Sequence, residues 1–158
     1  MPRKQIAAAC LLLVLCATAR ATCSADLRSG EIDDLLGDLQ LRLDGLAAAN
    51  RGADEQAGMW LDVTVRSGVV EQIGQLQILK LLVELRDSVT GTDNKRKVGE
   101  AIGAVTRTVS GNAKALRDLA GQGEHVDPRE SVVSQLRQVQ VLLDRVATLD
   151  ACPKKETP

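Results

Sequence analysis

Two cysteines near opposite ends of the chain, Cys23 and Cys152, carry its clearest chemistry. The other two cysteines, Cys10 and Cys16, lie in an N-terminal apolar run that we expect to be removed. An even pair of cysteines in a secreted chain predicts one disulfide. We therefore expect Cys23 to be joined to Cys152, with two free thiols or intermolecular pairing as the alternatives.

The first 21 residues have the pattern of a secretory signal peptide. Two basic residues precede an apolar run over residues 6–19, and residues 19–21 have the small-x-small pattern that signal peptidase recognises. We expect cleavage after residue 21 and secretion to the extracellular space. The alternatives are a lipoprotein acylated at Cys16 or Cys23 and a retained anchor, but the apolar run is too short for a stable membrane anchor.

Charge and aromatic content argue against nucleic acid as a partner. Removal of three basic residues with the signal lowers the formal net charge from −1 to −4. The chain has no phenylalanine or tyrosine and a single tryptophan, Trp60. Binding to nucleic acid depends on positive charge and on aromatic faces for stacking. We therefore expect no nucleic-acid partner, and carbohydrate binding would also lack ring faces.

The residues that usually perform catalysis are scarce. His125, the only histidine, lies in the glycine-containing stretch GQGEHVD, where we expect a solvated loop. The carboxylate pair Asp33 and Asp34 falls on the polar face of a predicted helix. One histidine and two distant cysteines form no usual metal site, and no phosphate-binding glycine motif is present. We expect no enzymatic activity, no metal and no cofactor.

One basic cluster, Lys95, Arg96 and Lys97, stands near the start of a predicted helix. It is a candidate patch for an anionic partner, or a dibasic processing site. Charge clusters of this kind more often face water, so a solvated surface is the alternative.

Apolar residues repeat at alternating spacings of three and four in three segments, which is typical of amphipathic, coiled-coil-like helices. These helices are predicted over residues 26–50, 93–120 and 127–150. In the last, Asp127 is expected to cap the helix and Pro128 to occupy its first position. The predicted core positions are Ile32, Leu36, Leu39, Leu43 and Leu46, then Val98, Ile102, Val105, Val109, Asn112, Leu116 and Leu119, and finally Val132, Leu136, Val139, Leu143 and Val146.

The segment between the first and second of these helices, residues 54–89, is harder to interpret. As one helix it would be about 54 Å long, clearly longer than its neighbours. The stretch MWLDVTV before Gly68 alternates like a strand. We therefore predict a break near Gly68, with a short helix or irregular arm before it and a main helix over residues 69–89.

Four amphipathic helices with short connections predict an all-α, antiparallel up-down four-helix bundle. Residues 22–152 would form this single domain, and residues 153–158 a disordered tail. An even number of helices places the two ends of the bundle chain on one side, where the disulfide between Cys23 and Cys152 can join them.

Residues 76–85 have more apolar surface than a bundle core requires. On a helical wheel their apolar residues cover about 220°, whereas one seam needs about 100°. We expect some of Ile78, Leu81, Leu82 and Leu85 to face outward or line a cavity, with Trp60 as a further candidate. The alternative is that the whole arc is core.

These features predict a binding protein whose apolar helix face contacts another protein or a second copy of the chain. Carriage of a small apolar ligand or lipid is the second hypothesis, and an extracellular structural or surface-coating role is the third.

Overall fold

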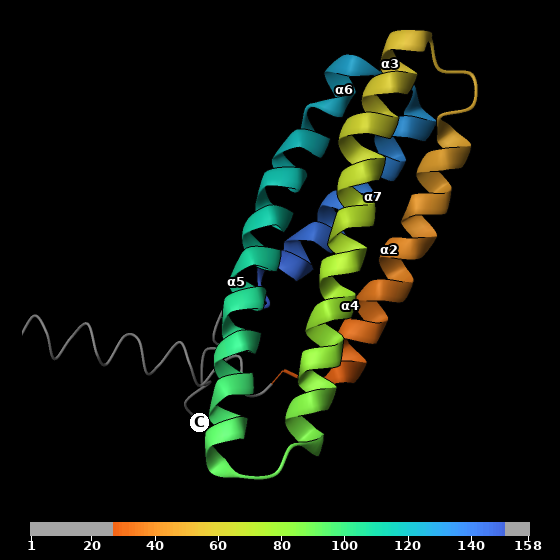
Figure 1. Cartoon of the computed structure of the whole chain (residues 1–158). Coiled ribbons are helices and arrows are strands. Elements are labelled where there is room, and N and C mark those ends of the chain that lie inside the picture. Colours follow the sequence, from red (N-terminus) through yellow and green to blue (C-terminus); the bar gives the residue numbers. More distant parts are fainter. Residues whose placement is uncertain (1–26, 151–158) are drawn as a thin grey trace, which may run out of the picture.

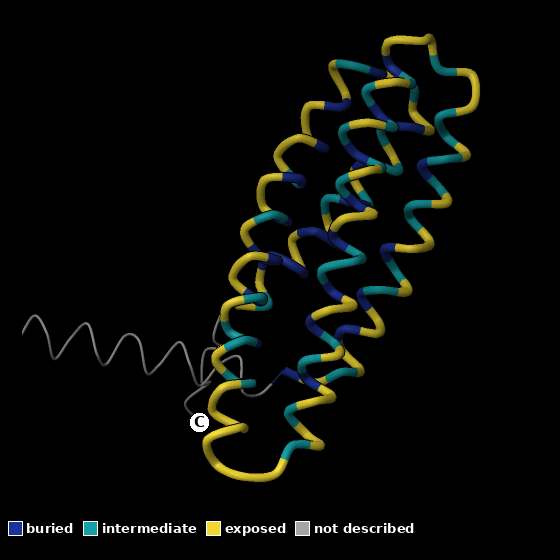
Figure 2. Tube along the Cα trace, in the orientation of Figure 1, coloured by how far each residue is buried: buried dark blue, intermediate teal, exposed yellow. Residues whose placement is uncertain are grey.

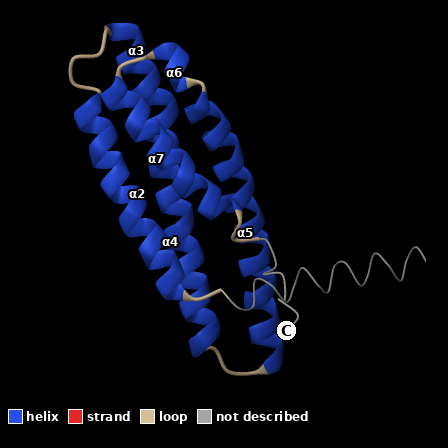
Figure 3. Ribbon diagram, turned by 180° about the vertical axis from the view of Figure 1, so that it is seen from behind, coloured by secondary structure: helices blue, strands red, loops and turns tan. Residues whose placement is uncertain are grey.

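The computed structural model describes residues 27–150, and in that range every regular element is helical (Figures 1 and 3). The predicted signal peptide, the tail at 153–158 and both Cys23 and Cys152 lie outside the described residues. The elements are α2 (Ser29–Ala49), α3 (Glu55–Trp60), the π-helix η2 (Leu61–Arg66), α4 (Ser67–Ser88), α5 (Thr92–Gly121), α6 (Gly123–Val126) and α7 (Glu130–Ala147).

Four helices pack antiparallel around one apolar core, as predicted. α2 contacts α4 and α7, and α5 contacts the same two helices, so that α4 and α7 occupy opposite corners of the bundle. Figure 1 shows this arrangement, with α4 in front of α7 and between α5 and α2. Figure 2 shows that the buried residues of each helix turn toward the shared interior.

The predicted break near Gly68 is wrong. α3, η2 and α4 follow one another without interruption, and the residues at both junctions, Leu61 and Ser67, keep right-handed helical dihedral angles. Gly68 lies inside α4 rather than at an end. A carbon atom added at its Cα would lie 2.6 Å from Leu116 Cδ1 on α5. The lack of a side chain at Gly68 gives room to Leu116 of the neighbouring helix, and the helix does not stop there.

The strand-like alternation before Gly68 is also explained by the π-helix. The core residues Ala57, Leu61, Val65 and Val69 are spaced by four each time, and all are buried. In an α-helix each such step would rotate the side chain about 40° beyond the previous one. The wider turn of a π-helix takes up this drift. As a result, the four side chains stay in line along the bundle core.

The predicted core positions of α7 are all buried, and those of α2 are buried or half-buried. The prediction for α5 is only partly correct. Ile102, Val109 and Leu116 are buried, but Leu119 is 39% exposed. Small residues take the remaining places in the core, because α5 packs closely against its two neighbours; they are Thr106, Ser110, Ala113 and Ala120.

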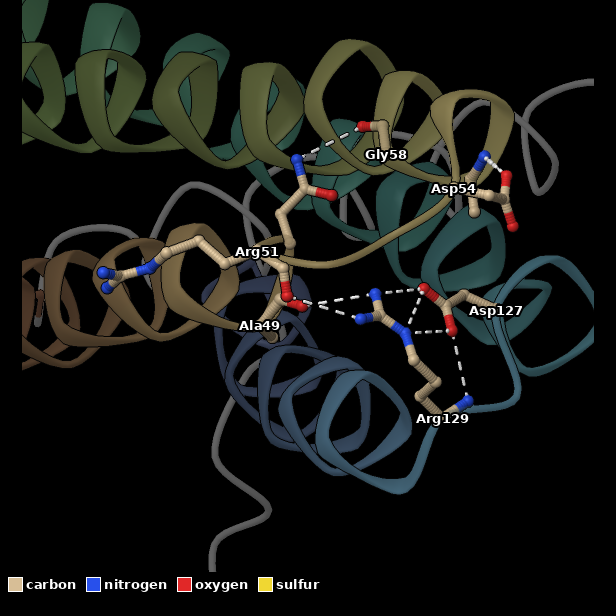
Figure 4. Close-up of polar contacts among 8 residues, drawn as sticks. Ala49, Arg51, Asp54, Gly58, Asp127 and Arg129 are labelled. Carbon is tan, nitrogen blue, oxygen red and sulfur yellow. Dashed lines mark hydrogen bonds and ion pairs between the residues drawn. The ribbon is translucent and has the colours of Figure 1, made fainter.

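The predicted cap of the last helix takes another form. α7 begins at Glu130, and Asp127 lies before it as a buried carboxylate. Its side chain pairs with the Arg129 guanidinium at 2.6 Å and accepts a hydrogen bond from the Arg129 backbone N–H at 3.1 Å. Arg129 also donates to the carbonyl oxygens of Ala49 and Arg51 at the end of α2 (Figure 4). Asp127 therefore orients an arginine that caps α2.

Candidate functional site

The most unusual surface of the bundle is a row of exposed apolar side chains along α3, η2 and α4, which we call the outer stripe. In residues 27–150, three other large apolar side chains are exposed, and they lie apart on α2, α5 and α7. The outer stripe consists of Met59 (63% exposed), Val63 (68%), Val70 (54%), Ile78 (54%), Leu81 (64%) and Leu85 (45%).

The outer stripe lies on the side of α4 that faces away from the core. On the core side, Val69, Leu76, Leu79 and Val83 are fully buried. If the small residues Ser67 and Gly74 are counted in the same row, its positions recur every three or four residues, and within α4 Val70 and Leu81 are eleven residues apart. Eleven residues complete three α-helical turns almost exactly, and the π-helix keeps Val63 in line with Ser67. The stripe therefore runs nearly straight for about 40 Å. α4 thus has two apolar faces on opposite sides.

Two small residues, Ser67 and Gly74, occupy the remaining positions of the same row. The Ser67 hydroxyl donates to the carbonyl oxygen of Val63, which keeps it close to the backbone. At Gly74, an added Cβ would have no heavy atom within 4 Å. The backbone of α4 is therefore bare at the middle of the outer stripe.

Polar contacts on both sides of α4 fix its rotation and so keep the outer stripe outward. Toward α2, the Lys80 ammonium pairs with Asp33 at 2.7 Å, and within α4 it also pairs with Glu84 at 3.6 Å. The hydrogen bond to Asp33 raises the pKa of Lys80 above its ordinary value. Toward α5, Asn112 donates to the Gln75 side chain at 3.2 Å.

Part of the outer stripe was predicted from the sequence. Of the predicted face, Ile78, Leu81 and Leu85 lie on the outer stripe, whereas Leu82 is half-buried and packs against the core. Trp60 is also half-buried and packs against the core, and its ring would lie 3.0 Å from a Cβ added at Gly123.

Met59, Val63 and Val70 were not among the predicted surface residues. The stretch MWLDVTV was interpreted with the two-residue period of a strand, which places Met59 and Val63 on the same face as Leu61 and Val65. Met59 and Val63 follow the same four-residue spacing that places Leu61 and Val65 in the core, and Val70 lies seven residues, or about two helical turns, after Val63.

The basic cluster lies in the first turns of α5, where two of its cations have acidic neighbours on the same helix. Arg96 pairs with Asp93 at 2.7 Å and with Glu100 at 2.6 Å, and Lys97 pairs with Asp93 at 2.8 Å. Hydrogen bonds from Lys97 and Arg96 lower the pKa of Asp93. These pairs neutralise much of the positive charge that an anionic partner would need.

The catalytic and metal candidates remain scattered. His125 is exposed on the short helix α6, Asp33 is engaged with Lys80, and Asp34 is exposed. Within residues 27–150, no group of three or more His, Cys, Asp or Glu side chains is placed to hold a metal ion.

A shallow depression of about 310 Å³ borders the outer stripe on its α5 side. Ser67 and Glu71 form one wall, and Ala115, Leu116 and Leu119 of α5 form the other. Leu119 is partly exposed at the rim, and polar residues, among them Thr64 and Asn112, also line the depression.

The fold and this surface define an antiparallel helical bundle with a second apolar face on one of its helices. None of the helices in the described range is long and apolar enough to span a membrane. Comparison of the chain with protein-family models, with curated proteins and with solved structures gave no match.

Proposed function

We propose that this chain is a secreted, non-enzymatic binding protein whose outer stripe contacts another protein. The observation that carries the proposal is the position of Val70, Ile78, Leu81 and Leu85, which are about half exposed on the side of α4 opposite its buried face. Exposed apolar side chains are common singly, but a contiguous apolar surface marks an interaction site.

The shape of the outer stripe favours a protein partner over a small apolar ligand. Small-molecule sites are concave and enclose most of the ligand. The outer stripe is instead a convex ridge about 40 Å long, with anchors spaced as in helix-to-helix recognition. A partner helix or an extended apolar groove can cover such a ridge along its whole length.

Secretion and the disulfide belong to the same proposal. α7 runs back toward the end of the bundle where α2 begins, which is the direction that a bond between Cys23 and Cys152 requires. By the chain-entropy model, closing a loop of this length contributes at most about 4 to 5 kcal/mol. Intact mass and peptide mapping of secreted material without reductant test both claims. Cleavage far from residue 21, or two alkylatable thiols, would contradict them.

The binding role is tested by comparing two substitutions to glutamate at similarly exposed leucines. Leu81 is 64% exposed on the outer stripe, and Leu41 is 58% exposed on α2. Each variant, immobilised beside the wild-type protein, is exposed to the fluid into which the native protein is secreted. We expect a partner that binds the wild type and Leu41→Glu but not Leu81→Glu. Equal binding of the partner by the wild type and both variants would overturn the proposal. It would also be overturned if an apolar dye bound saturably to the wild type and Leu41→Glu but not to Leu81→Glu.

A further inference from the structure

We infer that the outer stripe binds a second copy of this chain, with the two α4 helices antiparallel and a two-fold axis passing beside Gly74. The inference rests on the proposed function, because it names the protein that the outer stripe contacts. It is carried by the arrangement of the stripe residues about one point of the helix.

The stripe residues are placed symmetrically about Gly74. Val70 and Ile78 each lie four residues from it, and Val63 and Leu85 each lie eleven residues from it. An antiparallel two-fold axis at Gly74 pairs residues that are equally far from it on the two chains. Val70 of each copy therefore meets Ile78 of the other.

The same symmetry holds further along the helix. Val63 meets Leu85, and Ser67 meets Leu81, which are both seven residues from the axis. A surface that pairs with itself in this way is what an isologous dimer requires. Each stripe residue from Val63 to Leu85 therefore has a counterpart on the other copy, which is either another large apolar side chain or Ser67.

Gly74 itself supports the position of the axis. Glycine inside a helix is unfavourable relative to alanine. Within the chain nothing requires it, because an added Cβ would meet no atom within 4 Å. At a two-fold axis, by contrast, each bare backbone faces the other, which lets the two helices approach closely and brings the flanking side chains into contact.

The charges beside the outer stripe are complementary in the same register. Arg66 and Glu84 lie on the same flank of the helix. Arg66 is eight residues before Gly74, and Glu84 is ten residues after it. In the antiparallel dimer Arg66 of one copy lies near Glu84 of the other, and the pair occurs twice. Within one chain, Arg66 already forms an ion pair with Asp62 at 2.5 Å. The side chain of Glu84 pairs with Lys80 but is still 48% exposed. Each arginine would be shared between two carboxylates.

The apolar area predicts a modest affinity. Full burial of one aliphatic side chain removes roughly 60–120 Å² of apolar surface from water. With six side chains about half exposed, each copy contributes on the order of 300 Å² of apolar surface, and the stems of the flanking residues add more. Stable complexes bury about 800 Å² per partner. We therefore expect a dimer that dissociates on dilution through the micromolar range.

The first test is sedimentation equilibrium of the secreted full chain over a dilution series. The inference predicts a monomer–dimer equilibrium that Leu81→Glu weakens at least tenfold, whereas Leu41→Glu leaves it unchanged. Circular dichroism verifies that each variant is folded, and Val70→Ser serves as a second, milder stripe variant. A dimer that survives both stripe substitutions would overturn the inference.

The second test addresses the antiparallel orientation. Arg66→Glu and Glu84→Arg should each weaken self-association several-fold, and the double variant should recover it, because the exchange restores both pairs. In a parallel dimer Arg66 would face Arg66 and Glu84 would face Glu84, so neither single exchange would weaken association. That result would overturn the orientation.

A wild-type chain that stays monomeric at the highest soluble concentration overturns the inference as a whole. The proposed function is judged separately by the binding experiment with native fluid. If a partner there still distinguishes Leu81→Glu from Leu41→Glu, the outer stripe binds a different protein. If no partner distinguishes them, the proposed function fails as well.

Discussion

The two faces of α4 have nearly the same composition but opposite surroundings. Leu76, Leu79 and Val83 are fully buried between α2 and α5, whereas Ile78, Leu81 and Leu85 are about half exposed on the other side. Large aliphatic side chains predominate on both faces, although the buried face also includes the polar Gln72. The difference lies only in which side the neighbouring helices cover, and that depends on the packing of the whole bundle.

The largest effect should separate the two faces directly. Leu79→Glu would place an unpaired carboxylate in the core and should lower the free energy of unfolding by about 4 kcal/mol or more. Leu81→Glu changes an exposed side chain and should alter it by no more than about 0.5 kcal/mol.

Urea unfolding followed by circular dichroism measures both free energies, at a protein concentration low enough that self-association adds no stability. A loss of stability in Leu81→Glu as large as in Leu79→Glu would mean that the outer stripe is part of the core.

The sequence was sufficient to predict four helices, their antiparallel order and the core of α7, because regular three- and four-residue spacing reports a buried face directly. It also indicated that residues 76–85 carry excess apolar surface. Which side of that arc is covered depends on α2 and α5, and local spacing holds no information about them.

The errors have specific physical causes. Gly68 resembles a helix terminator in sequence, but its role is to admit Leu116 of the neighbouring helix. The π-helix is equally hidden, since four-residue spacing over a short stretch is compatible with several structures. Asp127 has the sequence context of a cap, yet it pairs with Arg129, whose other partners are the carbonyls of Ala49 and Arg51.

Gly68 and Gly74 allow the same substitution to be compared at a packed position and at an open position of α4. Gly68→Ala would force a methyl group against Leu116, 2.6 Å away, and should cost about 1–3 kcal/mol. Gly74→Ala meets nothing within the chain and should stabilise the monomer by up to about 1 kcal/mol.

The two substitutions are chemically identical, so changes of opposite sign in the free energy of unfolding would isolate the effect of packing. Chemical denaturation at low protein concentration measures these free energies. Gly111→Ala on α5 is the control, because Gly111 also has open space around it. Equal destabilisation by Gly68→Ala and Gly74→Ala would show that helix interior glycines respond alike on both faces.

The Asp127 and Arg129 pair allows the bundle to be weakened without touching either face of α4. The hydrogen bond from Arg129 lowers the pKa of Asp127 below its ordinary value of 3.8. A carboxyl with a lowered pKa contributes stability above the unfolded-state pKa and loses it as the pH falls through the folded-state pKa. Stability should therefore decline below about pH 4.

Asp127→Asn should remove that part of the acid dependence and cost about 1–3 kcal/mol at neutral pH, because the half-buried guanidinium loses its charged partner. Unfolding curves recorded between neutral pH and about pH 2 check both expectations. Self-association at neutral pH should be unchanged, and a weaker dimer in Asp127→Asn would indicate that the interface extends to the end of the bundle.

The smallest effect concerns the contact that holds α4 in its rotation. Lys80→Met removes the pair with Asp33 but keeps the length of the side chain, so only the charge interaction is lost. Because the pair is partly solvated, we expect a small decrease in stability that shrinks further at high salt. The pKa of Lys80 is raised above 10.5 in the folded protein. The stabilisation is therefore present at a pH below the unfolded-state pKa, and it is lost as the pH rises through the folded-state pKa. Unfolding curves of the wild type and Lys80→Met should therefore converge in strongly alkaline solution. If Lys80→Met instead reduced self-association as strongly as Leu81→Glu, the outer stripe would owe its direction to this single ion pair rather than to the buried face behind it.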